Sequence, residues 1–135
     1  MPQVVTVILI NDEGKILILK RSKKVRTYKG KWGGVAGYIE KNEKPLETAI
    51  KEIKEEVDLD TKDIELLKQL EPICITDFYE GKKYDWSIFS FLFKTKEKNK
   101  IKIDWEHSEY RWIAPSQLKN LETVPYFKEI VLKLL

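Results

Sequence analysis

Three glutamates, at positions 52, 55 and 56, constrain this chain more than any other feature. If residues 45–57 form a helix, the spacing i, i+3, i+4 places these three side chains on one stripe, because each residue turns the helix by about 100°. Apolar residues recur on a separate side at the period of a core-facing helix: Leu46, Ala49, Ile50, Ile53 and Val57. Clustered carboxylates repel one another unless a cation lies among them, and hard divalent ions such as Mg²⁺ prefer oxygen ligands. The segment therefore predicts a helix that carries a metal site.

The flanking residues agree with this helix. Pro45 suits the first turn, where its missing N–H costs nothing. Residues 30–37 hold four of the six glycines, and a glycine-interrupted strand is expected just before the helix. An alternative is a solvated helix face with ordinary i, i+4 ion pairs, Glu47–Lys51 and Lys51–Glu55. The lysines Lys51 and Lys54 are expected on the side away from the three glutamates, which favours the metal site.

The same residues resemble the signature of the Nudix hydrolase family. That signature reads Gly, five residues, Glu, seven residues, and then Arg-Glu-apolar-x-Glu-Glu-x-Gly-apolar. Two positions depart, with Lys51 in place of Arg and Asp58 in place of Gly. Residues 30–33 and 106–112 also resemble segments that flank the signature in this family. Seven positions match without insertion: Gly37, Glu43, Glu52, Ile53, Glu55, Glu56 and Leu59.

The two departures have different weight. Asp58 falls where the helix should end, often in a left-handed conformation, which Asp tolerates at a cost of about 1 kcal/mol or less. Lys51 offers one flexible ammonium where Arg offers a rigid two-pronged fork. In the family this Arg braces the acidic cluster, so we expect Lys51 to loosen the site without abolishing it.

The resemblance implies an α+β fold, a Nudix-type α/β/α sandwich with a mixed sheet between helices, as a single domain over residues 1–135. It also implies hydrolysis of a diphosphate bond in a nucleoside di- or triphosphate derivative. The cofactor implied is Mg²⁺, with Mn²⁺ as an alternative, because a divalent ion neutralises phosphate oxygens and activates a water for attack on phosphorus.

The resemblance also assigns roles to particular residues. Glu55 and Glu56 match metal ligands, and Glu52 matches a ligand or a residue that orients the attacking water. The carbonyl of Ala36 matches a further ligand, and Gly37 opens the signature. Two residues are expected to brace the loop before the helix, Glu43 and Lys51.

Family members often take one more metal-binding acid from outside the signature. Glu106 is the residue chosen here, with Glu97 and Glu109 as alternatives. His107 is the single histidine, which excludes a metal site built from several histidines. We expect His107 to be an exposed or hydrogen-bonded loop residue rather than a catalytic base.

The residues that bind the rest of the substrate are less constrained. Arg21 ends a predicted strand and is assigned to a phosphate, within a basic stretch at residues 21–31. Tyr79 and Trp86 flank a predicted turn and are assigned to a base-binding slot, together with Phe78 and Tyr84. Packing within the fold is the alternative for these aromatic side chains.

Composition limits the remaining function classes. With 42% hydrophobic and 35% charged residues, the chain can bury a core and is not disordered. The sequence has no apolar run that could span a membrane and no leader pattern, so a cytoplasmic protein is expected. A net charge of +3 without a long basic tract argues against nucleic-acid binding. The partner is a small nucleotide-derived substrate, and a homodimer is left open.

Two other functions share this fold. One is a catalytically weak nucleotide-binding sensor, which the change at Lys51 keeps open. The other is an isopentenyl-diphosphate isomerase, which needs a catalytic cysteine. Cys74 is the single cysteine and lies in an apolar run, so we expect a buried, inert thiol.

Hydrophobic patterning predicts the order of the elements. Residues 4–10 and 15–20 read as a hairpin around an Asn-Asp-Glu-Gly turn. The other strands expected are residues 32–39, 64–78, 83–94, 101–104 and 109–113. After the helix at 45–57, a short turn at 115–118 and a closing amphipathic helix at 124–135 are expected.

Overall fold

The computed structural model describes residues 1–96 and 100–135. Its centre is an eight-stranded mixed sheet, with the path β3-β2-β1-β7-β5 and with β4, β6 and β8 paired to β1, β7 and β2. The strands are β1 (Gln3–Ile10), β2 (Ile16–Arg21), β3 (Trp32–Gly33), β4 (Val35–Tyr38), β5 (Ile64–Gln69), β6 (Ile73–Tyr79), β7 (Lys82–Thr95) and β8 (His107–Ile113). The pairing of β1 with β7 is parallel, and the other strand pairs are antiparallel.

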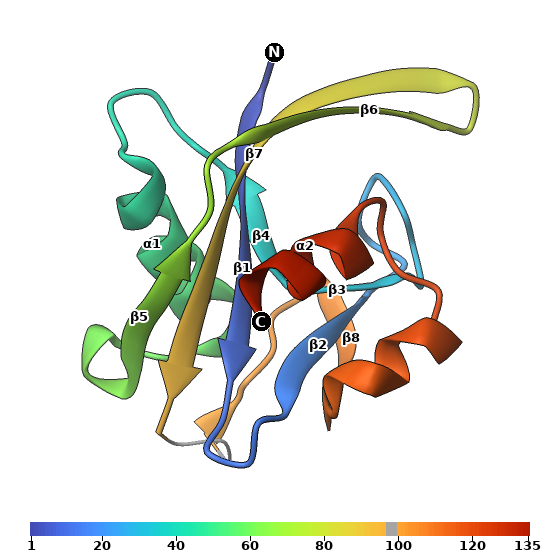
Figure 1. The fold of residues 1–135 in the computed structure, drawn as a ribbon. Coiled ribbons are helices and arrows are strands. Elements are labelled where there is room, and N and C mark those ends of the chain that lie inside the picture. The colour runs from blue at the N-terminus through green and yellow to red at the C-terminus, as the bar shows by residue number, and fades with distance from the viewer. Residues whose placement is uncertain (97–99) are drawn as a thin grey trace.

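Two α-helices cover opposite faces of this sheet (Figure 1). Helix α1 (Pro45–Val57) packs on the face that receives Val5, Val7 and Leu9 of β1. Helix α2 (Phe127–Leu134) packs on the other face, which receives Ile8 of β1. Because side chains alternate along a strand, β1 contributes to both cores, and the molecule has the three-layer arrangement expected from the sequence.

The long strand β7 divides its partners between its two ends. Its C-terminal half pairs with β1 and β5, while its N-terminal half pairs with β6 and projects from the body as a two-stranded arm (Figure 1). A two-residue turn closes this arm, with Glu80 at φ 49° and Gly81 at φ 78°. Two such residues with positive φ match the twist of a hairpin. The arm therefore extends the sheet beyond the two covered faces.

Most predicted elements are present, but several bounds were wrong. The apolar run at 64–78 is two strands, β5 and β6, rather than one. Residues 101–104 form no strand, since Lys102 N donates to Val57 O at the end of α1 (3.1 Å) and Ile101 is buried against that core. The predicted turn is a 3₁₀ helix, Pro115–Asn120, and the closing helix begins at Phe127.

The prediction for Cys74 was wrong, because this residue is exposed. It lies on β6, where the neighbouring Ile75 is buried against the sheet core. Alternation places the two side chains on opposite faces, and the arm is covered on one face there. An apolar sequence run could not distinguish a strand buried on both faces from this one.

No helix in the described part of the chain is long and apolar enough to cross a membrane.

Candidate active site

Helix α1 begins and ends as its sequence predicts. Pro45 is its first residue, and Lys44 N donates to Glu47 Oε1 (2.9 Å), which satisfies one backbone group at the N-terminus. Asp58 ends the helix in a left-handed conformation at φ 58°, and its N–H donates to Lys54 O. Asp58 therefore adopts the left-handed conformation that the sequence predicted for it.

The three glutamates of the stripe lie in different environments. Glu55 is exposed, Glu52 is half-buried, and Glu56 is 1% exposed. Glu56 Oε1 accepts a weak hydrogen bond from Ala36 N (3.4 Å), while Oε2 is buried without a hydrogen-bond partner among the described residues. Burial raises the pKa of Glu56 well above its usual value, and the neighbouring carboxyls of Glu52 and Glu106 raise it further. A buried carboxyl of this kind is costly unless a cation compensates it.

Gly37 provides the space in which Glu52 lies. A Cβ at position 37 would be 2.4 Å from Glu52 Cδ and 2.7 Å from Glu52 Oε1. The glycine therefore lets the carboxyl approach the backbone of β4 directly. Burial also raises the pKa of Glu52, with a further contribution from Glu55.

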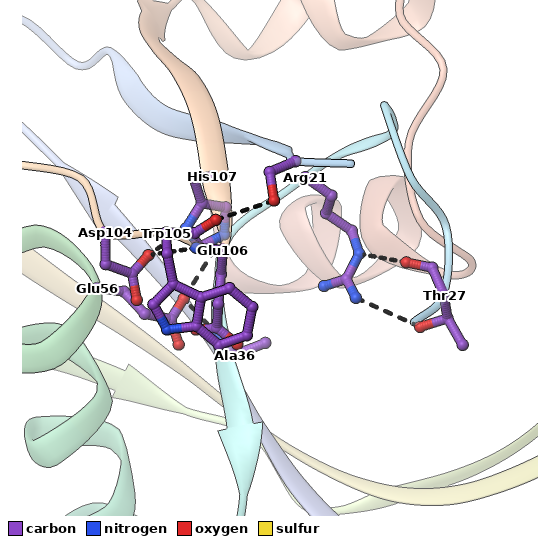
Figure 2. A network of polar contacts seen from close by, with 9 residues as sticks. Arg21, Thr27, Ala36, Glu56, Asp104, Trp105, Glu106 and His107 are labelled. Carbon is purple, nitrogen blue, oxygen red and sulfur yellow. Dashed lines mark hydrogen bonds and ion pairs between the residues drawn. The ribbon is translucent and has the colours of Figure 1, made fainter. Parts of the chain in front are cut away.

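Glu106 approaches the same carboxyls from the turn before β8. Burial raises the pKa of Glu106 to about 7, and the charges of Asp104 and Glu52 contribute. The turn is held by hydrogen bonds from Ser22 N to Glu106 O (2.8 Å) and from Ser22 Oγ to Trp105 O (2.9 Å). Figure 2 shows Glu106 beside Ala36 and Glu56. Helix α1 and the turn before β8, which are about 50 residues apart in sequence, thus meet at one acidic site.

An open groove of about 460 Å³ has four of the five predicted metal-binding residues in its lining: Ala36, Glu52, Glu55 and Glu106. The fifth, Glu56, is buried outside this lining, with its Oε1 3.4 Å from Ala36 N. Glu109 is directed elsewhere, since its carboxylate pairs with Arg111 Nε at 2.8 Å. Glu97, the other alternative, lies outside the described residues. Of the two described candidates outside the signature, Glu106 and Glu109, Glu106 is therefore the one that shares a groove with the stripe.

The donor set suits a hard divalent cation such as Mg²⁺. It consists of carboxylate oxygens and a backbone carbonyl, and it includes the unpartnered Oε2 of Glu56. Within residues 1–96 and 100–135, no three acidic, histidine or cysteine side chains already converge as a metal-binding group. Binding an ion therefore requires at least one side chain to move, which the exposed Glu55 can do while Glu52 stays beside Gly37.

His107 differs from its prediction. It is hydrogen-bonded, but it is buried at the start of β8 rather than exposed in a loop. Its Nδ1 lies 3.1 Å from Asp104 Oδ1, and its Nε2 lies 3.7 Å from Glu56 Oε1 (Figure 2). Burial lowers the pKa of His107. Asp104 was not identified from the sequence as the partner of His107. The one available signal was that Asp104 lies three residues before the histidine, within reach of a local hydrogen bond.

A brace fixes the loop before α1. Lys51 Nζ donates to Glu43 Oε2 at 2.8 Å, which is the contact expected between these two residues. Glu43 Oε1 also accepts hydrogen bonds from Thr48 Oγ1 (2.9 Å) and Glu40 N (3.0 Å). The hydrogen bond to Lys51 lowers the pKa of Glu43. A single ammonium therefore makes this contact, from the position where the signature has Arg.

A second cleft, of about 210 Å³, adjoins the acidic groove. The two share Ala36, Gly37, Tyr38 and Glu106 in their linings. The walls of this cleft are mostly apolar and aromatic, and they include Trp86. Such a cleft, with a few polar groups at one end, is the usual form of a site for a planar ligand.

Arg21 lines this cleft, as its assignment requires. Its Nε donates to Thr27 O (2.8 Å) and its Nη2 to Thr27 Oγ1 (3.3 Å), which orients the guanidinium (Figure 2). Burial lowers the pKa of Arg21, while Glu106 and Glu56 favour its charged form. The guanidinium of Arg21 therefore lies between the carboxylates of the groove and the aromatic side chains of the cleft.

Tyr79 does not line this cleft, although it was assigned to it. Its ring packs on Tyr28 with centroids 4.6 Å apart, and it is Tyr28 that lines the cleft beside Trp86. Phe78 is 69% exposed, and Tyr84 stacks on Trp86 at 5.5 Å. Sequence reasoning missed Tyr28, which lies in a basic segment without an aromatic pattern.

Comparison with known proteins agrees with this geometry. The profile of the NUDIX domain family matches residues 1–135. The chain belongs to the Nudix family. This membership confirms the family resemblance and the expected hydrolase class, and it does not favour the isomerase.

Individual relatives are more distant. The chain is 26% identical to an RNA pyrophosphohydrolase of Pelagibacter ubique over 132 residues, covering 87% of this chain and 78% of that one. It is also 26% identical to the nucleoside triphosphatase NudI of Escherichia coli, covering 84% and 83%. A solved Ap4A hydrolase of C. elegans has a TM-score of 0.78 at 16% identity, covering 98% and 94%, and this likeness supports the fold.

Proposed function

We propose that this Nudix protein hydrolyses a diphosphate bond in a nucleoside di- or triphosphate derivative, with Mg²⁺ as its cofactor. The observation that carries the proposal is that two cavities adjoin: the groove lined by the glutamates (the acidic groove) and the cleft lined by Trp86 (the aromatic cleft). A substrate bound across it has its phosphates near Glu52, Glu55 and Glu106 and its planar group near Trp86. The names of the relatives, which include an RNA pyrophosphohydrolase and a nucleoside triphosphatase, support a substrate of this class.

The chain's own residues divide the work. Glu52, Glu55, Glu56 and the carbonyl of Ala36 hold the cation, and Glu106 completes the set from the turn before β8. The cation supplies neutralisation of phosphate charge and an acidified water. Gly37 lets Glu52 occupy its place beside the backbone, and the Glu43–Lys51 contact steadies the loop between them.

Arg21 and Trp86 act on the rest of the substrate. The guanidinium is held by Thr27 in the lining of the cleft, so it meets a phosphate there without a large loss of side-chain entropy. Trp86 presents an apolar face to a planar ring.

The test is phosphate release from nucleoside triphosphates, nucleotide sugars and dinucleoside polyphosphates, with Mg²⁺, Mn²⁺ or EDTA. We expect metal-dependent release from one class. Glu56→Gln should lower that rate at least a hundredfold, because a neutral amide replaces a charged ligand. Glu47→Gln is the matched control on the same helix, since its side-chain oxygen still accepts the bond from Lys44 N, and its rate should stay within twofold of the wild-type rate.

Two results would contradict the proposal. One is near-normal turnover in folded Glu56→Gln, which would remove the metal-binding account of the helix. The other is no release from any class by the folded protein. Nucleotide binding that is unaffected by EDTA would then identify the chain as a sensor.

A further inference from the structure

The segment of residues 22–31 is a basic loop fixed at both ends. At its start, Ser22 Oγ donates to Trp105 O (2.9 Å). At its end, Gly30 N donates to Arg21 O and Arg21 N donates to Lys31 O, both at 2.9 Å. Between these ends the loop exposes four cationic side chains: Lys23, Lys24, Arg26 and Lys29.

Tyr28 joins the far part of this loop to the β6–β7 arm. Its hydroxyl donates to Asp77 Oδ2 at 2.6 Å, across 49 residues of sequence. Its ring packs on Tyr79 at 4.6 Å and on Trp86 at 6.2 Å, and the residue is 8% exposed. Burial and the hydrogen bond to Asp77 raise the pKa of Tyr28, so the phenol remains a donor at neutral pH. Loop and arm, which do not pair as strands, are thus connected by one tyrosine.

The backbone of Tyr28 is in a left-handed conformation, with φ 52°. For a bulky residue this conformation is strained and persists only where surrounding contacts impose it. The bond to Asp77, the two ring contacts and the hydrogen bond that Tyr28 O accepts from Lys31 N (3.1 Å) are contacts of this kind. Loss of the Tyr28–Asp77 bond therefore also removes one of the contacts that keep the loop in this strained conformation.

The position of the loop decides the position of one wall of the cleft. Thr27 and Tyr28 both line the cleft, and Thr27 makes both hydrogen bonds that orient Arg21. A shift of the loop away from the arm would separate this wall from Trp86 and release the guanidinium. It would leave helix α1 in place, because that helix packs on the core through Ala49, Ile53 and Val57.

We propose that Tyr28 is a positioning residue that latches the loop of residues 22–31 onto the β6–β7 arm. By this latch it sets affinity for the substrate without entering the chemistry. Trypsin provides a direct measure of the latch, since the four exposed cationic residues of the loop are cleavage sites and cleavage of a native loop follows its opening.

The experiment compares Tyr28→Phe, Asp77→Ala and the double variant in the metal-free protein without substrate. Phe keeps the ring and the backbone strain and removes the hydroxyl alone. Mass spectrometry follows cleavage after the four loop sites. We expect cleavage about tenfold faster in each single variant, in the range for loss of a hydrogen bond to a carboxylate. The double variant should be no faster than the singles, because both remove the same bond. Tyr110→Phe, on β8, is the matched control and should leave loop cleavage unchanged.

Loop cleavage within twofold of wild type in Tyr28→Phe would overturn the proposal, and so would single effects that multiply in the double variant. A kinetic measurement adds the consequence for substrate, and this part rests on the proposed function. Tyr28→Phe should raise KM about tenfold with kcat within twofold, whereas a fall in kcat alone would contradict a positioning role. Absence of any hydrolysis would refute the proposed function and leave the proteolysis result to decide the latch.

Discussion

Replacement of Gly37 by alanine should separate catalysis from folding in this protein. The added Cβ would lie 2.4 Å from Glu52 Cδ, whereas ordinary contact begins near 3.4 Å. The carboxyl must therefore retreat by about 1 Å. A misplacement of that size in a catalytic constellation can lower the rate about a hundredfold. We expect a loss of this order in kcat/KM for Gly37→Ala, measured on the substrate that the panel identifies.

Stability should change little in the same variant. Gly37 has no positive φ, so alanine fits the backbone there, and the group that must move is the end of a flexible side chain. Alanine also lowers the entropy of the unfolded chain, which offsets part of the crowding. We expect the free energy of unfolding, measured in urea, to stay within about 1 kcal/mol of the wild-type value.

Gly34→Ala is the matched control for this prediction. Its Cβ would lie 2.5 Å from the backbone oxygen of Val7, which cannot rotate away. That variant should lose about 1–3 kcal/mol of stability by overpacking. Gly37→Ala with wild-type kcat/KM and wild-type stability would show that hydrolysis does not need Glu52 in its place beside the glycine, and our account of the site would then be wrong.

Two further predictions concern charge. Lys51→Arg should keep or raise kcat/KM, because the guanidinium can make the bond to Glu43 with two donors; a loss of more than fivefold would show that Lys51 has its own role. Glu106→Gln should stabilise the metal-free protein at pH 7.5 and much less at pH 5, as measured by urea unfolding. The folded pKa of Glu106 is raised to about 7, so its contribution to stability is present at low pH and is lost as pH rises through that value. His107 has a lowered pKa and acts in the opposite direction in both proteins, so its contribution appears in both. Removal of the Glu106 charge also eases ionisation of Glu56, which adds to the stabilisation at pH 7.5. A stabilisation by Glu106→Gln that is larger at pH 5 would contradict the assignment.

Helices and strands were predictable from the sequence where a pattern within a few neighbouring residues determines them. Helix α1 and its left-handed end at Asp58 follow from helical periodicity and from the chemistry of one residue. The strand at 101–104 was wrong for the converse reason, because alternating apolar residues there are buried against the end of α1 rather than paired in a sheet. The exposure of Cys74 was also beyond the sequence, since it depends on which face of the arm is covered.

The candidate site was predictable only in part. The sequence brought together Glu52, Glu55 and Glu56, and its family resemblance pointed to Ala36 and Glu106. It gave no sign of the contact between Tyr28 and Asp77, and it placed Tyr79 in a cleft that Tyr28 lines. The roles of these residues in binding and catalysis stay predictions for the experiments above.

By itself, the sequence determined that three glutamates share one stripe of a helix and that a glycine-rich strand comes just before that helix, because both follow from short-range spacing. Only the tertiary structure decided that Glu56 is the buried member and Glu55 the exposed one, that His107 and Asp104 stand behind Glu56, and that a loop and an arm close the cleft. Burial depends on which strands pair. The parallel pairing of β1 with β7 and the return of β8 to β2 connect segments too far apart in sequence for any local pattern to relate them.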